Sequence, residues 1–132
     1  MNQNEVEKDM RENDNSDLCF VTCPGGSNVS LLAYKAASKL EKDNYGKFVR
    51  LAGEHAKEKD QMRLADAVKY AKQWVLIEGC SKGCGKKILD CAGIEADKHF
   101  LVTSLGIERE NKIDHTQEEL EQVLTAVKGM LK

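Results

Sequence analysis

Two cysteines, Cys80 and Cys84, lie between an apolar run and a helical pattern. The apolar run, Trp74–Ile77, has no polar alternation and predicts a strand buried on both faces, as in a parallel sheet. Residues Lys86–Leu89, after the cysteines, predict a helix. The two thiols therefore follow the end of a buried strand, which is the edge where ligands bind in open parallel sheets.

The spacing of Cys80 and Cys84 suits metal binding. If the helix begins near Cys80, then Cys84 lies one turn further along on the same face. Two thiolates on one face can bind the same metal ion, because a zinc–sulfur bond is about 2.3 Å long. A helix N-terminus also favours the negatively charged thiolate. The alternative is that both thiols are buried as small apolar side chains, as free cysteines often are.

A third cysteine, Cys23, ends the first predicted strand, Leu18–Thr22. In a flavodoxin-like strand order the first and third strands are neighbours, and a crevice opens between their C-terminal ends. We therefore expect Cys23, Cys80 and Cys84 to converge at this crevice and to bind zinc as thiolates.

The fourth ligand is open. His55 follows the second predicted strand, Lys47–Leu51, and is a candidate nitrogen ligand at the same end of the sheet. Glu78 is the other candidate, as a ligand, as a hydrogen-bond acceptor beside the site, or as a charge at its rim; water is the remaining alternative. His99 and His115 are expected to be structural or solvent-facing.

The two remaining cysteines are too far along the chain to share the ion. Cys19 precedes Cys23 by four residues, about 13 Å along a strand, and Cys91 follows Cys84 by seven, about 10 Å along a helix. Both are expected to be core cysteines.

The turn after Cys23 has a Gly-Gly-Ser sequence that resembles an anion-binding loop. It has neither the lysine of a P-loop nor a Gly-x-Gly-x-x-Gly pattern. No arginine occurs between Cys23 and Ser30, which counts against a phosphatase loop.

Composition narrows the class of protein. The chain has 132 residues, 41% hydrophobic and 32% charged, with a net charge of −2, which is typical of one soluble domain. The sequence has no basic patch large enough to bind nucleic acid, and no apolar run is long enough to span a membrane. We expect a cytoplasmic protein with reduced thiols, for which metal or catalytic roles outrank disulfides.

The remaining patterns predict an α/β domain over residues 17–132, preceded by a mobile polar tail at residues 1–16. Strands and helices alternate, which predicts a three-layer sandwich with a mainly parallel four-stranded sheet in flavodoxin-like or Rossmann-like order. The strands are expected at Leu18–Thr22, Lys47–Leu51, Trp74–Ile77 and Lys98–Thr103. The helices are expected from Ser27 or Asn28 to Leu40, at Gln61–Lys72 with Asp60 as cap, before Gly93, and after a capping box formed by Thr116 and Glu119.

Taken together, these residues resemble the DGC-domain family of small proteins expected to bind zinc. The resemblance covers most of residues 18–108 and rests on four segments: Cys23-Pro-Gly-Gly-Ser-Asn-Val, Glu78-Gly79-Cys80 with Cys84, Ala92-Gly93-Ile94, and Val102–Ile107. It implies a zinc ion held by cysteines. The chain departs from the family pattern in two places: the Asp of the family motif is Glu78, and Arg50 stands where members often carry another cysteine.

Two other functions use the same thiols. A redox enzyme would use Cys23 as the attacking thiolate and Cys80 or Cys84 as its resolving partner. An iron–sulfur site would use the cysteines as cluster ligands. The sequence leaves open whether the protein is an enzyme and which protein partner it has.

The composition of residues 1–16 leads to the first testable prediction. Apart from Met1, Val6 and Met10 the segment is polar, so it offers little apolar area to bury. Deleting it is expected to change the melting temperature, measured by differential scanning calorimetry, by no more than a few degrees. A larger drop would mean that the segment packs on the domain.

Overall fold

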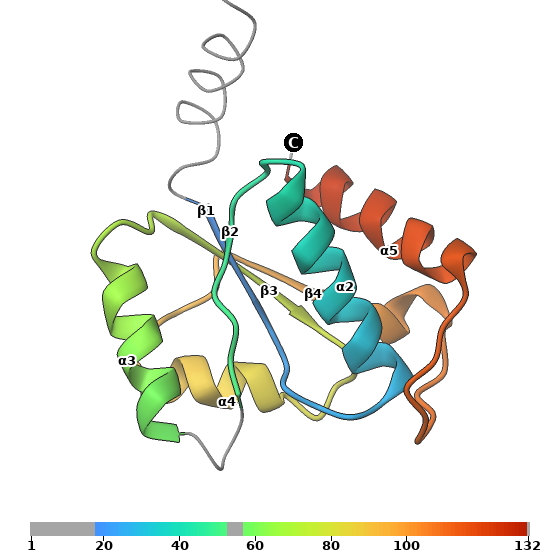
Figure 1. Cartoon of the computed structure of the whole chain (residues 1–132), viewed down its shortest axis with the longest axis horizontal. Helices are drawn as coiled ribbons and strands as arrows, with labels where there is room; N and C mark the ends of the chain where they lie inside the picture. Colours follow the sequence, from blue (N-terminus) through green and yellow to red (C-terminus); the bar gives the residue numbers. More distant parts are fainter. Residues whose placement is uncertain (1–17, 53–56, 132) are drawn as a thin grey trace, which may run out of the picture.

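The computed structural model describes residues 18–52 and 57–131. The described chain folds around one sheet of four strands, β1 (Leu18–Thr22), β2 (Lys47–Phe48), β3 (Gln73–Glu78) and β4 (Lys98–Leu101). All neighbouring strands are parallel, and their order is β2-β1-β3-β4 (Figure 1). This confirms the predicted α/β fold and the flavodoxin-like strand order.

The two central strands are apolar because both of their faces are covered. On β1, Leu18 and Phe20 point into one core and Cys19 and Val21 into the other. Alternate residues of β3 divide in the same way. Since side chains alternate across a strand, a continuous apolar run is what two covered faces require.

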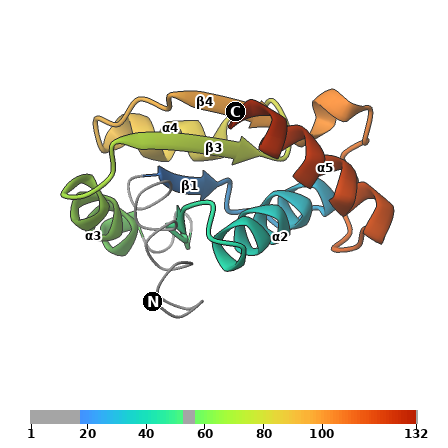
Figure 2. The ribbon, with the colours of Figure 1, turned by 90° about the horizontal axis from the view of Figure 1, so that it is seen from above.

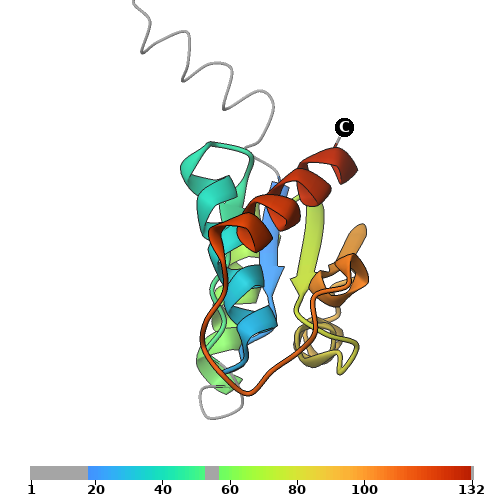
Figure 3. The ribbon, with the colours of Figure 1, turned by 90° about the vertical axis from the view of Figure 1, so that its right-hand side faces the viewer.

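The helices form the outer two layers. Helices α2 (Asn28–Lys42) and α5 (Gln117–Met130) cover one face, and α3 (Lys57–Val68) and α4 (Cys84–Cys91) cover the other (Figures 2 and 3). None of the helices in the described ranges is long and apolar enough to cross a membrane.

The predicted caps of α2 and α5 are present. The Ser27 hydroxyl accepts a hydrogen bond from the Ser30 N–H at 3.3 Å. At α5, Thr116 and Glu119 form the predicted capping box. Gly93, just after α4, has a φ of 70°, as expected of a residue that ends a helix.

The predicted start of α3 is wrong. The helix begins at Lys57, so Asp60 lies inside its first turn and does not cap it. The Asp60 carboxylate is buried, accepts the Ala52 N–H at 2.8 Å and contacts Arg63 at 3.3 Å. Asp60 resembles a helix cap in the sequence, but its side chain bonds a backbone N–H outside the helix.

Two strands are shorter than predicted. Strand β2 ends at Phe48, beyond which Arg50 turns toward Glu41, with 3.1 Å between the charged groups. Strand β4 ends at Leu101, and a single 3-10 turn, η2 (Val102–Leu105), follows it. The Thr103 N–H of η2 donates to the carbonyl of Gly79 at 3.1 Å, so the first turn after β4 stays bonded to the segment that follows β3.

Gly79 gives a test of how closely α2 approaches the sheet. A Cβ there would lie 2.8 Å from the backbone of both Val29 and Ser30, whereas one at Gly26 would meet nothing within 4 Å. We expect Gly79→Ala to lower the free energy of unfolding in urea by about 1–3 kcal/mol, and Gly26→Ala to change it by less than about 1 kcal/mol. Equal stability of the two variants would contradict this packing.

Candidate functional site

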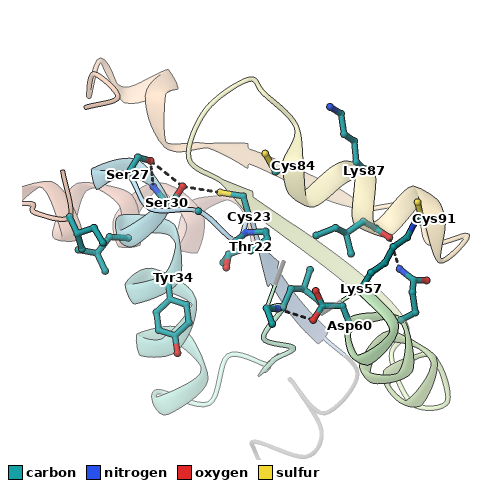
Figure 4. A pocket seen from close by; sticks show the side chains of 18 residues that line it. Thr22, Cys23, Ser27, Ser30, Tyr34, Lys57, Asp60, Cys84, Lys87 and Cys91 are labelled. Atoms are coloured by element: carbon teal, nitrogen blue, oxygen red, sulfur yellow. Dashed lines mark hydrogen bonds between the residues drawn. The ribbon is translucent and has the colours of Figure 1, made fainter. Parts of the chain in front are cut away.

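A pocket of about 960 Å³ opens at the C-terminal edge of β1 and β2, between α2 on one side and α3 and α4 on the other (Figure 4). We call it the thiol pocket. Residues that line it include Cys23, Ser30, Tyr34, Lys57, Cys84 and Cys91. The pocket takes lining residues from the end of β1 and from the segment after β2 and none from β3, so it lies to one side of the crevice predicted between β1 and β3. Its volume is that of a small-molecule site.

Cys23 is the buried thiol of the pocket, with 9% of the residue exposed. Its Sγ accepts a hydrogen bond from the Gly79 N–H at 3.1 Å and lies 3.6 Å from the Ser30 hydroxyl. Burial raises the pKa of the Cys23 thiol, while the hydrogen bonds from Gly79 and Ser30 oppose that rise. The raised pKa keeps the thiol protonated at neutral pH, and the two donors are in place to stabilise a thiolate once it forms.

Cys84 and Cys91 come from the other wall of the pocket. They stand at the two ends of α4, seven residues apart, and both are exposed (Figure 4). Seven residues make almost two helical turns, so the two thiols share one face of α4. Gly85 and Leu89 take the opposite, buried face.

The prediction that Cys91 is a core cysteine is therefore wrong, whereas Cys19 is fully buried as predicted. The physical reason is the register of α4. Its buried face follows Leu89, which packs with Leu76 and Ile94 in the core, and this turns Cys91 outward.

Cys80 lies on a different side of the sheet edge. It is partly buried against the core beneath α2 and α5, and it is absent from the lining of the thiol pocket. Helix α4 begins only at Cys84, after Gly83 with a φ of 75°, so Cys80 and Cys84 do not share a helical face. The turn between them sends the two side chains in different directions.

The fourth predicted ligand, His55, lies in residues 53–56, outside the described part of the chain. Its described neighbours Ala52 and Lys57 both line the thiol pocket. Across residues 18–52 and 57–131, no three His, Cys, Asp or Glu side chains gather closely enough to hold one metal ion. Of the four predicted ligands, the structure brings Cys23 and Cys84 to the thiol pocket.

Glu78 is almost fully buried, with 1% exposed, so it is not a charge at the rim. One carboxylate oxygen, Oε1, accepts the N–H groups of Gly85 at 2.6 Å and Lys86 at 3.1 Å, and Oε2 lies 2.9 Å from His99 Nε2. The position of His99 is thus structural, as expected, with its side chain 37% exposed. His115 bonds the carbonyl of Thr116 near the start of α5, away from the thiol pocket.

Three residues that line the pocket are not among those expected from the sequence: Cys91, Lys57 and Lys87. The seven-residue spacing from Cys84 to Cys91 was a usable signal, because it places both residues on one helical face. No comparable signal marks the two lysines, which look like ordinary surface residues. Arg50, at the place of the extra family cysteine, stacks on Phe48 and bonds Glu41.

Comparison with known proteins gives one match. A family model described as the DGC domain matches residues 19–127, which includes every described cysteine of the pocket. No curated protein and no solved structure matches the chain.

The exposure of each cysteine, together with the raised pKa of Cys23, predicts the order in which the thiols react. In metal-free protein, iodoacetamide is expected to label Cys84 and Cys91 first and Cys19 and Cys23 last, because buried thiols with raised pKa values present little thiolate. Raising the pH should speed labelling of Cys23, since its pKa lies above the ordinary value of 9.0.

Peptide mass spectrometry at timed intervals measures this order, and the urea-unfolded protein, in which all five thiols should react alike, is the control. Labelling of Cys23 as fast as Cys84 in the folded protein would contradict the geometry.

Proposed function

Because the chain belongs to the DGC-domain family, we propose that it binds a zinc ion through cysteine thiolates at the C-terminal edge of its sheet. Cys23 and Cys84 are the first two ligands in this proposal, and Cys80 and His55 complete the set. The family implies the metal, and the arrangement of thiols in the thiol pocket supports it.

The observation that carries the proposal is the environment of Cys23. Its sulfur is buried, yet it accepts a backbone N–H from Gly79 and has a hydroxyl 3.6 Å away. Hydrogen bonds to a charged form favour that form, so these two donors partly offset the burial that raises the pKa of Cys23 and would stabilise its thiolate once a cation draws the proton off. A thiolate is the form that binds zinc.

The donor set fits zinc in part. Cys23 and Cys84 are soft sulfur ligands that open to one pocket, as a zinc site requires. Recruiting Cys80 requires the turn at residues 81–83, which is largely exposed, to rearrange. His55 lies outside the described residues, in the segment between Ala52 and Lys57, both of which line the pocket.

When bound, zinc would supply the positive charge that keeps the ligating sulfurs deprotonated. Cys23 must lose its proton for this to happen, and the Gly79 N–H and the Ser30 hydroxyl then hold the resulting negative charge. We extend the proposal to a cytoplasmic location, because all five cysteines are free thiols, as suits a reducing compartment.

A second candidate function is thiol redox chemistry between Cys23 and Cys84. The observation in its favour is that these two thiols line one open pocket that takes no third ligand from the described residues. With a small disulfide such as glutathione disulfide as oxidant, two exchange steps would form a Cys23–Cys84 disulfide and release two molecules of glutathione.

Metal analysis of each variant tests the zinc proposal. Inductively coupled plasma mass spectrometry of the protein purified without chelator is expected to find about one zinc per chain. Replacing Cys23, Cys80 or Cys84 with Ser should each remove the metal, and the matched controls Cys19→Ala and Cys91→Ala should keep it. Zinc retained by the Cys80→Ser protein would overturn the ligand set.

His55 is tested by affinity. If it is a ligand, His55→Ala should weaken zinc binding about 10–100-fold in competition with a coloured chelator, by analogy with losses around metal sites. His115→Ala, which changes a histidine outside the pocket, is the control.

Protein that carries no zinc but forms the Cys23–Cys84 disulfide with glutathione disulfide would favour the redox function.

A further inference from the structure

We propose that Glu78 is a positioning residue that holds Cys84 beside Cys23. The inference rests on the proposed function in one respect, namely that these two thiols act together on one ligand. It goes beyond that proposal because it assigns the pairing of the thiols to a carboxylate that binds neither of them.

The first step concerns the start of α4. Gly83 occupies the cap position of this helix and provides no side-chain hydrogen bond. The first N–H groups of a helix have no partner within it, and a buried helix end needs one from elsewhere. Glu78 supplies it from the end of β3, where its Oε1 accepts the N–H groups of Gly85 and Lys86.

The second step concerns the cost of burying this carboxylate. A buried charge is stable only when its oxygens are well bonded. Here Oε1 has two backbone donors and Oε2 has the imidazole of His99 at 2.9 Å. The three contacts fix the carboxylate from two elements, α4 and β4, so its position is well determined.

The third step links the carboxylate to the thiols. A Cβ on Gly85 would lie 3.4 Å from Cys23 Cα and 3.1 Å from Glu78 Oε1, so the first turn of α4 is packed directly onto Cys23. Cys84 is the residue next to Gly85. The residue after Glu78, Gly79, donates its N–H to Cys23 Sγ. Two consecutive residues at the end of β3 therefore hold both thiols. Glu78 holds Cys84 by bonding the first turn of α4, and Gly79 holds Cys23 by donating its N–H to the sulfur.

A trivalent arsenical reports this pairing without zinc. Hydrated phenylarsine oxide reacts with two thiols to form two arsenic–sulfur bonds and release two waters, and the bridged product resists a competing monothiol only when the two sulfurs lie close together. The protein for this test carries Cys19→Ala, Cys80→Ala and Cys91→Ala, so that Cys23 and Cys84 are the remaining thiols.

Adding Glu78→Gln to this protein is expected to weaken retention of the arsenical against 2-mercaptoethanol about 10-fold, the scale of losses from groups that orient ligands. The control is Thr116→Ala, which removes the side-chain N-cap of α5, away from the pocket. The control should lower stability but keep the affinity of the parent protein for the arsenical.

Equal retention in the Glu78→Gln protein and the parent, or an equal loss in Glu78→Gln and Thr116→Ala, would overturn the inference. Circular dichroism shows whether each variant folds. If Glu78→Gln does not fold, His99→Ala takes its place, because it removes the imidazole that contacts Oε2 and helps to fix the carboxylate. It should weaken retention in the same direction, and unchanged retention would count against the inference.

The two proposals fail separately. If the parent retains the arsenical and depends on Glu78 while the natural protein carries no zinc, the zinc proposal is wrong and the positioning role of Glu78 stands. If zinc binds normally in the Glu78→Gln protein and the arsenical is also retained, the positioning role is wrong and the zinc proposal stands.

Discussion

The buried carboxylate of Glu78 is the interaction on which the geometry of this edge of the sheet depends. It joins the end of β3 to the start of α4 and to His99 on β4. Because helix α4 has no side-chain cap of its own, this carboxylate satisfies backbone groups that would otherwise be buried without partners. The location of the Cys84 wall of the thiol pocket follows from it.

Close backbone contacts at two glycines support the same arrangement. Gly79 lets α2 approach the end of β3, and Gly85 lets the first turn of α4 rest on Leu76 and Cys23. A side chain at either position would meet atoms at 2.8–2.9 Å. Gly79 and Gly85, which flank the Cys80–Cys84 turn, therefore have a packing role.

The sulfur chemistry of the pocket follows from this packing. Cys23 is buried, with its pKa raised by burial, and Cys84 is exposed on the facing helix. A protonated, hydrogen-bonded thiol next to an accessible one is a dithiol site whose ionisation a bound cation would promote. The two proposed functions, zinc binding and thiol exchange, both draw on this pair.

The sequence by itself determined the alternation of strands and helices, the parallel sheet, the caps of α2 and α5 and the place of Cys23 at the sheet edge, because each of these depends on local pattern and on rules of chain connection. It could not determine the start of α4 or the directions of Cys80, Cys84 and Cys91. Those depend on which backbone groups Glu78 accepts and on how Leu89 packs, and no local sequence pattern identifies such partners. Only the tertiary structure decided that Cys23 and Cys84 line one pocket and that Cys80 packs against the core beneath α2 and α5.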